Sequence, residues 1–274
     1  MSEQQKPHLS ATQLESYCRC PEAWRRRYIE GEVIPPGIAI LKGGAFHKGV
    51  ETNMRQKIES HRDLPKGDIA DAAVAALDDA ARGNISLTEE EVSRGVKAVL
   101  GEAIDDTRSM AEAHAESQSP DYQPVLVEAK VLIELPNAPR DLLGIIDLAD
   151  TQDRIVDFKT SGKRKPQSDA DDSVQLTIYA AAYERMTGYP PAEVRLDSIV
   201  KTKTKTDRQV LTSERTEADF SALAHRVNAV TAAIQLGSFP PATPGAWWCG
   251  PRFCGYWSTC PFVNSQRKAL AEKE

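Results

Sequence analysis

Residues 125–160 carry a clear alternation of apolar and polar positions with a period of two. Such alternation is typical of β-strands, because successive side chains point to opposite faces of a sheet. The pattern predicts three strands, Val125–Leu135, Leu142–Ala149 and Arg154–Thr160. Asp150–Asp153 has the composition of a tight turn, so the second and third strands are predicted to form a hairpin.

Helical segments are predicted on both sides of this block. Ser10 and Pro21 are residue types that commonly start helices, and the alanine-rich residues 68–117 are interrupted mainly around Gly83–Ser86. Val33–Ile40, which contains two prolines, is predicted to be a loop. The predicted helices are 11–18, 22–30, a segment that follows Gly43–Gly44, at least two within 68–117, DDSVQLTIYAAAYERM ending near Thr187, and 217–236.

The second half of the chain adds two more strands, near Arg195–Lys201 and Arg208–Ser213, which flank a turn at Thr202–Asp207. The polar segment Ser161–Asp172 is predicted to be a mobile connection. From residue 125 the order is therefore three strands, a helix, two strands and a helix. This order predicts an α+β fold with a mixed sheet.

Composition narrows the setting without fixing the function. The chain has 274 residues, of which 41% are hydrophobic and 27% charged, and its formal net charge is −6. This charge argues against a generally basic nucleic-acid coat protein, although local basic patches still allow DNA binding. No apolar run approaches a membrane span, and the N-terminus lacks a signal-peptide core. We therefore expect no membrane association and a cytoplasmic location, where cysteines are more often ligands or catalysts than disulfides.

Three charged residues in the predicted hairpin point to metal chemistry. Asp157 and Lys159 share one face of their strand, and Asp147 on the partner strand can lie alongside Asp157. Unpaired buried charge is costly, so two carboxylates among Ile, Val and Leu call for a partner. Aspartate oxygens can hold Mg²⁺ or Mn²⁺, and a lysine can then orient water and stabilise charge on a phosphate. Alone, this spacing also fits an ordinary hairpin with a surface ion pair.

The five cysteines lie near the two ends of the chain and form a second candidate site. Cys249, Cys254 and Cys260 are grouped, and Cys20, which precedes Pro21, supplies a distant fourth thiol. Iron–sulfur clusters take four thiolates, whereas zinc sites usually arrange four cysteines as two close pairs. The three-plus-one spacing favours iron–sulfur, with zinc as the alternative. Cys18 is the residue left over, although it could replace Cys20 as a ligand.

These features together resemble those of a known family. His47 lies in KGGAFHKGVE after two glycines, and Gln175 and Tyr179 share a helical face at positions i and i+4. Read in order with the aspartates, Lys159 and the cysteines, the chain resembles the PD-(D/E)XK nuclease superfamily from about Leu9 to Phe262. It is similar in particular to RecB-like exonucleases with a cysteine cluster, which include AddB-type nuclease domains and CRISPR-associated adaptation nucleases. One departure is that Ile146 stands where the name-giving proline is expected.

The resemblance implies a restriction-endonuclease-like sheet and a role for each site residue. His47, Asp147 and Asp157 would bind Mg²⁺ or Mn²⁺ with help from the backbone carbonyl of Phe158, and Glu128 is an even choice between a ligand and a solvent-facing residue. Lys159 would activate the attacking water. Gln175 and Tyr179 would brace the lysine or the scissile phosphate, while a core role for Tyr179 stays open. Cys20, Cys249, Cys254 and Cys260 would bind a structural [4Fe-4S] cluster.

The expected organisation is a single nuclease domain over residues 1–274. Its parts are N-terminal helices over 1–50 with one cluster cysteine and His47, a helical insertion over 51–120, a nuclease core over 121–236, and a cysteine segment over 237–274 that the cluster ties to the N-terminal region. Lys201, Lys203 and Lys205 lie on the predicted hairpin tip, where they could reach DNA, although such runs are usually solvated faces.

The expected function is a metal-dependent DNA nuclease, an exonuclease acting on single strands or duplex ends in repair, recombination or viral DNA processing. The encoding genome would be bacterial, archaeal or that of a phage. One alternative is a nuclease that trims DNA for CRISPR adaptation and works with a recombination or adaptation partner. Another is a non-catalytic DNA-binding subunit, against which the complete Asp147, Asp157 and Lys159 set argues.

Overall fold

The structure is a computed structural model that describes residues 8–134 and 140–263. Leu135, at the end of the first predicted strand, and residues 264–274 of the predicted cysteine segment lie outside the described residues. The chain divides into two compact units. Unit 1 combines residues 1–34, 135–141 and 224–274, and unit 2 contains residues 35–134 and 142–223.

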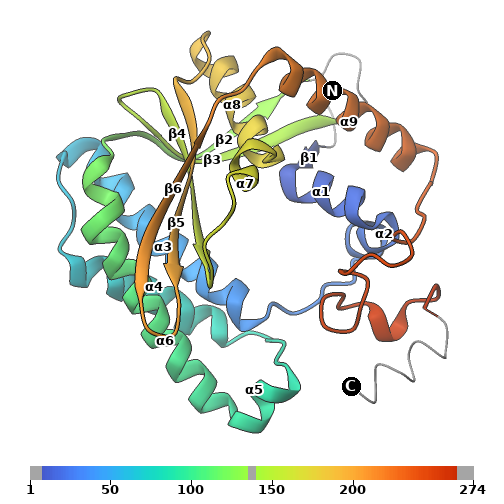
Figure 1. Cartoon of the computed structure of the whole chain (residues 1–274), viewed down its shortest axis with the longest axis horizontal. Helices are drawn as coiled ribbons and strands as arrows, with labels where there is room; N and C mark the ends of the chain where they lie inside the picture. Colours follow the sequence, from blue (N-terminus) through green and yellow to red (C-terminus); the bar gives the residue numbers. More distant parts are fainter. Residues whose placement is uncertain (1–7, 135–139, 264–274) are drawn as a thin grey trace, which may run out of the picture. The chain divides into compact units, whose positions relative to one another are not determined.

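Unit 2 is built on a mixed β-sheet (Figure 1). Neighbouring strands pair antiparallel in β2–β3, β3–β4 and β5–β6, whereas β4 and β5 are parallel. The bounds of these strands are β2 Pro124–Ile133, β3 Asp141–Asp150, β4 Arg154–Ser161, β5 Glu193–Lys201 and β6 Thr206–Ser213. Each agrees within a few residues with one of the five strands expected from the sequence.

Helices pack on both faces of the sheet. Val156 and Phe158 of β4 join the core formed with Phe46 and Val50 of α3, whereas Lys159 bonds to Gln175 of α8. The alternation of β4 therefore places α3 and α8 on opposite faces. The helices of unit 2 are α3 Ile38–Ser60, α4 Lys66–Ala81, α5 Glu89–Arg94, α6 Val96–Ala113, α7 Ser168–Asp171 and α8 Val174–Thr187, with a π-turn at His114–Gln118 and a 3₁₀ turn at Ser119–Asp121. The predicted α+β class, a mixed sheet flanked by helices, is confirmed.

One local prediction for unit 2 is wrong, since helix α3 starts at Ile38 rather than after Gly43–Gly44. A glycine within this helix has a packing role, because a Cβ on Gly49 would come within 2.9 Å of the Ala73 side chain and the Ile69 carbonyl of α4. Such a glycine permits close helix packing instead of ending a helix. The connection Ser161–Asp172 contains the short helix α7, and its mobility stays a prediction.

Unit 1 brings together segments from both ends of the chain. Ser10 caps α1, because its hydroxyl accepts a hydrogen bond from the Gln13 N–H at 3.2 Å while the Gln13 side chain accepts one from the Ser10 N–H. Tyr17 and Trp24 pack against Phe239 from the other end. Its elements are β1 His8–Ser10, α1 Ala11–Arg19, α2 Pro21–Tyr28, the part of α9 (Glu217–Gln235) from residue 224, and the 3₁₀ turn Trp257–Thr259. Among the described residues, no helix of either unit has the length and apolar character that a membrane crossing requires.

Candidate active site

The β3–β4 hairpin sets the position of the two aspartates. Its turn is closed by Asp150, whose carboxylate accepts hydrogen bonds from the backbone N–H groups of Gln152 at 3.0 Å and Arg154 at 3.1 Å. Asp153 adopts the left-handed conformation, with φ of 56°, which short polar residues tolerate in turns. Beyond the turn Leu148 pairs with Val156. Continued by one residue beyond the ladder, this register would set Asp147 opposite Asp157.

Asp147 is nearly buried and is surrounded by groups from three elements. Its Oδ2 accepts a hydrogen bond from the Phe158 N–H at 3.1 Å and lies 3.5 Å from the His47 Nδ1. Its Oδ1 accepts one from the Tyr179 hydroxyl at 3.4 Å. Burial, followed by the negative charge of Asp157, raises the pKa of Asp147 well above its usual range. A cation at this position would stabilise the ionised carboxylate.

Asp157 and Lys159 form one end of a hydrogen-bonded chain that reaches α8. The Lys159 Nζ donates to Asp157 Oδ1 at 2.9 Å and to Gln175 Oε1 at 3.0 Å. The Gln175 amide then donates to the Tyr179 hydroxyl at 2.5 Å. The ammonium group is thus held in a defined orientation while a third of the lysine side chain stays exposed. The hydrogen-bonded series returns to Asp147 through Tyr179, so these side chains hold one another in place.

The second oxygen of Asp157 is the least satisfied group of the site. The residue is 1% exposed, and its Oδ2 has no hydrogen-bond partner among the described residues. A buried carboxylate oxygen without a partner costs free energy, and native proteins generally satisfy such groups with a partner, water or a metal ion. A buried carboxylate oxygen without a hydrogen-bond partner is available to bind a divalent cation.

Glu128 completes the site through an unusual backbone conformation. Its φ is 48°, in the left-handed region that residues with a Cβ rarely adopt, although it lies within strand β2. One ligand atom from each of His47, Glu128 and Asp147 can lie within 4.8 Å of the others. Strain of this kind persists where the surrounding structure requires it and is frequent at functional sites. The structure thus brings Glu128 together with His47 and Asp147, and its role as a ligand stays a prediction.

The protonation states suit a metal site. Burial, with a further contribution from the Lys159 charge, lowers the pKa of His47, so its imidazole is neutral near neutral pH and can donate a lone pair. Burial also disfavours the charged form of Glu128, which for a carboxyl group means a raised pKa. Phe158, whose carbonyl was expected to help, lies between Asp157 and Lys159 on β4, with its ring in the core. His47, Glu128 and Asp147 thus fit a divalent cation in chemistry and placement, and the carboxylate of Asp157 fits it in chemistry.

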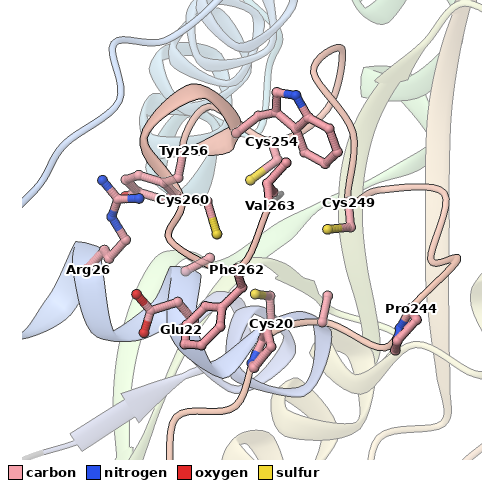
Figure 2. A pocket seen from close by; sticks show the side chains of 14 residues that line it. Cys20, Glu22, Arg26, Pro244, Cys249, Cys254, Tyr256, Cys260, Phe262 and Val263 are labelled. Atoms are coloured by element: carbon pink, nitrogen blue, oxygen red, sulfur yellow. The ribbon is translucent and has the colours of Figure 1, made fainter. Parts of the chain in front are cut away.

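The cysteines of unit 1 meet around one cavity of about 120 Å³ (Figure 2). Figure 2 shows the sulfur atoms of Cys20, Cys249, Cys254 and Cys260 directed into the same space. Burial is the main cause that raises the pKa of the Cys254 thiol, and the other three sulfurs act in the same direction. Cys18 is exposed and does not line this cavity.

The predicted basic tip is partly neutralised by carboxylates. The Lys201 Nζ lies 3.6 Å from Asp106 Oδ1, and the Lys205 Nζ donates to Asp207 Oδ2 at 2.9 Å. Lys203 and Lys201 line a shallow depression together with Asp105. These pairings leave less free positive charge here than the sequence suggests.

A buried polar network that sequence reasoning missed supports the site from the opposite face. Asp197 is fully buried and accepts hydrogen bonds from Arg208 and Tyr122 at 2.7 Å each and from Gln118, also at 2.7 Å. Gln118 in turn bonds to His114, at 2.9 Å, in the π-turn. The available signal in the sequence was Asp197, a charged residue between the apolar positions Leu196 and Ile199, because its partners are far away in sequence.

This network reaches strand β4 through aromatic contacts. The His114 ring packs edge-to-face on Phe158 at 5.4 Å and on Phe46 at 5.9 Å between centroids. Phe158 lies next to Asp157 and Lys159, and Phe46 next to His47. The network therefore packs against the backbone segments of α3 and β4 that carry the candidate ligands.

Comparison with known proteins identifies a family. A family model described as "PD-(D/E)XK nuclease superfamily" matches residues 8–261. A crystal structure of a protein named "putative exonuclease" from Eubacterium rectale is similar in fold, with a TM-score of 0.54, 14% sequence identity and coverage of 91% of each chain. A protein named SSO0001 aligns with a TM-score of 0.40 and 15% identity over 95% of this chain and 88% of its own. No curated protein sequence matches the chain.

Proposed function

Because this chain belongs to the PD-(D/E)XK nuclease superfamily, whose members use divalent metals, we propose that it is an Mg²⁺- or Mn²⁺-dependent deoxyribonuclease that works as an exonuclease. The observation that carries the proposal is the convergence of His47, Glu128 and Asp147 beside the unpartnered, buried Oδ2 of Asp157. Family membership gives the class of reaction, and this cluster indicates that the chain retains the groups to perform it.

The residues His47, Glu128, Asp147 and Asp157 would hold the cation, with the Phe158 carbonyl as a further oxygen. A bound divalent cation supplies charge stabilisation for the phosphodiester and lowers the pKa of water. The protein contributes the placement of its ligands, which the hairpin register and the strained backbone of Glu128 fix in advance. Such preorganisation is the main way in which a protein stabilises developing charge.

Lys159 is the proposed catalytic ammonium group. Asp157 and Gln175 orient it by two hydrogen bonds of 2.9 and 3.0 Å, and its partial exposure leaves it accessible to a substrate phosphate. In this position the ammonium can orient an attacking water and stabilise negative charge on the phosphate. Gln175 and Tyr179 are proposed as positioning residues, because they reach the reaction centre through Lys159 and Asp147.

For unit 1 we propose a structural [4Fe-4S] cluster held by Cys20, Cys249, Cys254 and Cys260. The chemistry of the donors fits, because four thiols converge on one space and four thiolates are the usual ligand set of a cubane cluster. The grouping of three cysteines with one distant cysteine favours a cluster over zinc, whose four cysteines usually come as two close pairs.

The substrate is proposed to be DNA, as single strands or duplex ends, during repair, recombination or viral DNA processing. Trimming of DNA for CRISPR adaptation, with a partner protein, is the alternative process. A non-catalytic DNA-binding role is disfavoured by the hydrogen-bonded placement of Lys159, which a binding subunit has no reason to keep.

The direct test is digestion of end-labelled single- and double-stranded DNA by anaerobically purified protein in Mg²⁺, Mn²⁺ or EDTA. We expect mononucleotides or short products that carry 5′-phosphates, released from an end, only with the metals. Internal cleavage of circular single-stranded DNA would replace the exonuclease assignment with an endonuclease. Absence of any metal-dependent product, in protein shown to be folded and to contain iron, would refute the catalytic proposal.

A further inference from the structure

Trp247, Trp248, Arg252 and Phe253, called the aromatic platform below, form an exposed patch in unit 1. Trp247 is 67% exposed and Phe253 57%, which is unusual for side chains of this size. Their rings contact each other at 5.0 Å between centroids, and Trp247 also contacts Trp248 at 5.6 Å. The Arg252 guanidinium lies 5.8 Å from the centre of the Phe253 ring.

The platform is held in place instead of being a loose loop. The Trp248 indole N–H donates to the Arg19 carbonyl at 3.1 Å, which ties the loop to the end of α1. The backbone N–H groups of Phe253 and Cys254 both bond to the Gly250 carbonyl, at 3.1 and 2.9 Å. Cys249 and Cys254, which line the cysteine cavity, directly follow Trp248 and Phe253. Rings fixed in advance lose little conformational entropy when they bind a partner.

The charge of the segment that carries the platform indicates the kind of partner. The chain has 40 acidic residues, yet none lies between Phe220 and Ala271, where Arg226, Arg252, Arg267 and Lys268 are the charged residues. In a protein with a net charge of −6, a long segment whose own side chains include no carboxylate is suited to contact with a polyanion. Exposed aromatic rings beside an arginine are the groups on which unpaired bases stack.

We propose that the aromatic platform binds unpaired bases of single-stranded DNA by stacking on Trp247 and Phe253, with Arg252 contacting the strand's phosphate or a base face. This inference rests on the proposed nuclease activity for its choice of DNA as the nucleic acid. It adds a binding site in unit 1 to the catalytic residues of unit 2. It also gives the cysteine cavity a second role, because a cluster bound there would fix the loop that carries the aromatic rings.

Binding of a fluorescent oligothymidylate of roughly 20 nucleotides, longer than the 4–16 nucleotides that such sites commonly cover, tests this proposal in EDTA, where no cleavage occurs. The full chain, purified anaerobically, is compared with Trp247→Ala, Phe253→Ala and Trp247→Phe. Each alanine variant is expected to weaken binding by about 5- to 100-fold, the usual loss of one stacked base, whereas Trp247→Phe keeps most of the affinity. Arg252→Ala should also reduce the salt dependence of binding, by about one in the log–log slope, which the ring variants leave unchanged.

The matched control is Leu236→Ala, because Leu236 is 84% exposed in unit 1 and is not part of the platform. It is expected to bind as the wild type does. Wild-type affinity in Trp247→Ala and Phe253→Ala would overturn the proposal. A loss of self-association in these variants with unchanged oligothymidylate binding would do so too, and would identify the platform as a protein interface. Failure of the nuclease assay with platform-dependent binding intact would refute only the proposed function, because the two measurements are independent.

Discussion

The proposed catalytic cluster of unit 2 and the cysteine cavity of unit 1 are assembled in opposite ways. In unit 2, Asp147, Asp157 and Lys159 lie on adjacent strands of one hairpin, so the fold of the hairpin places them before any ligand arrives. In unit 1, Cys20 comes from one end of the chain and the other three sulfurs from a segment that has only a 3₁₀ turn among residues 237–263. A hydrogen-bonded sheet can hold repelling carboxylates together, whereas loops from distant segments need their ligand as a cross-link.

This difference predicts that variants in unit 2 lose chemistry while keeping stability, and that variants in unit 1 lose stability first.

Asp157→Ala is expected to reduce DNA cleavage by at least about 10²- to 10³-fold, the cost of losing one preorganised electrostatic contact. The melting temperature should be unchanged or higher, because the substitution removes a buried carboxylate with an unpartnered oxygen next to Asp147. Cleavage rate and thermal unfolding are measured together. Asp71→Ala, at an exposed surface ion pair on α4, is the control expected to change neither. Near-wild-type cleavage by Asp157→Ala would remove Asp157 from the active site.

Lys159→Ala is expected to lower the cleavage rate by about 10²-fold, within the range for a group that assists proton transfer. Its Mn²⁺ affinity should persist, since an ammonium group is not a metal ligand. Calorimetric titration with Mn²⁺ separates the two effects, with Lys66→Ala at an exposed ion pair as control. If metal binding disappeared together with activity, Lys159 would have to be reinterpreted as a support of the ligands.

Cys254→Ala is expected to remove the brown colour and the absorbance near roughly 400 nm of anaerobic protein, with loss of the approximately four irons of a cubane. Loss of the cross-link should lower the melting temperature by about 10 °C, because constraints on long loops contribute roughly 4 kcal/mol. Cys18→Ala is the matched control, since Cys18 is exposed and outside the cavity lining. Stoichiometric zinc without iron in the wild type would replace the cluster by a zinc site, and full colour in Cys254→Ala would exclude this ligand.

The buried His114 predicts a pH dependence of stability. Burial lowers the pKa of His114 to about 4, whereas an unfolded chain restores a value near 6.5. Between these values the unfolded state binds more protons than the native state, so the free energy of unfolding falls as the pH drops, by up to about 1.4 kcal/mol per pH unit. His114→Phe should lack this part of the slope in urea titrations, and His225→Gln, at an exposed position, should retain it. Equal slopes in all three proteins would contradict the buried neutral state of His114.

Glu128→Gly should unfold with a free energy about 1 kcal/mol higher than that of Glu128→Ala. Both lose the carboxylate, but only glycine adopts a φ of 48° without strain. The pair therefore separates the backbone strain at β2 from the metal-ligand role, which both variants should lose equally in Mn²⁺ titrations. A glycine variant no more stable than the alanine variant would show that the strain is small.

The sequence predicts most of the sheet because its signals are local. Apolar and polar residues alternate around Asp147 and Asp157, and turn residues lie between the two aspartates. These neighbouring signals specify both the hairpin and its register. The helix that carries Gln175 and Tyr179 is likewise expected from its composition and from the Gly188 that ends it. The candidate site residues lie within these strands and this helix, so the pattern that predicts the elements also indicates the site.

The features that the sequence does not reveal depend on distant partners. Gly43 and Gly44 indicate a helix start when read locally, but α3 runs through them and uses Gly49 to approach α4. The left-handed backbone of Glu128 leaves no trace in a strand pattern. The Asp197–Arg208 pair and its extension to His114 join segments that are far apart in sequence.

The most direct test compares the cleavage rates of Asp157→Ala and Cys254→Ala with that of the wild type, per mole of folded protein and at a temperature below all three melting transitions. We expect that Asp157→Ala loses at least about 10²-fold, whereas Cys254→Ala stays within several-fold of the wild type on duplex ends. Equal losses in both variants, or a larger loss in Cys254→Ala, would contradict the assignment of the chemistry to unit 2 and of structural support to the cysteine cavity.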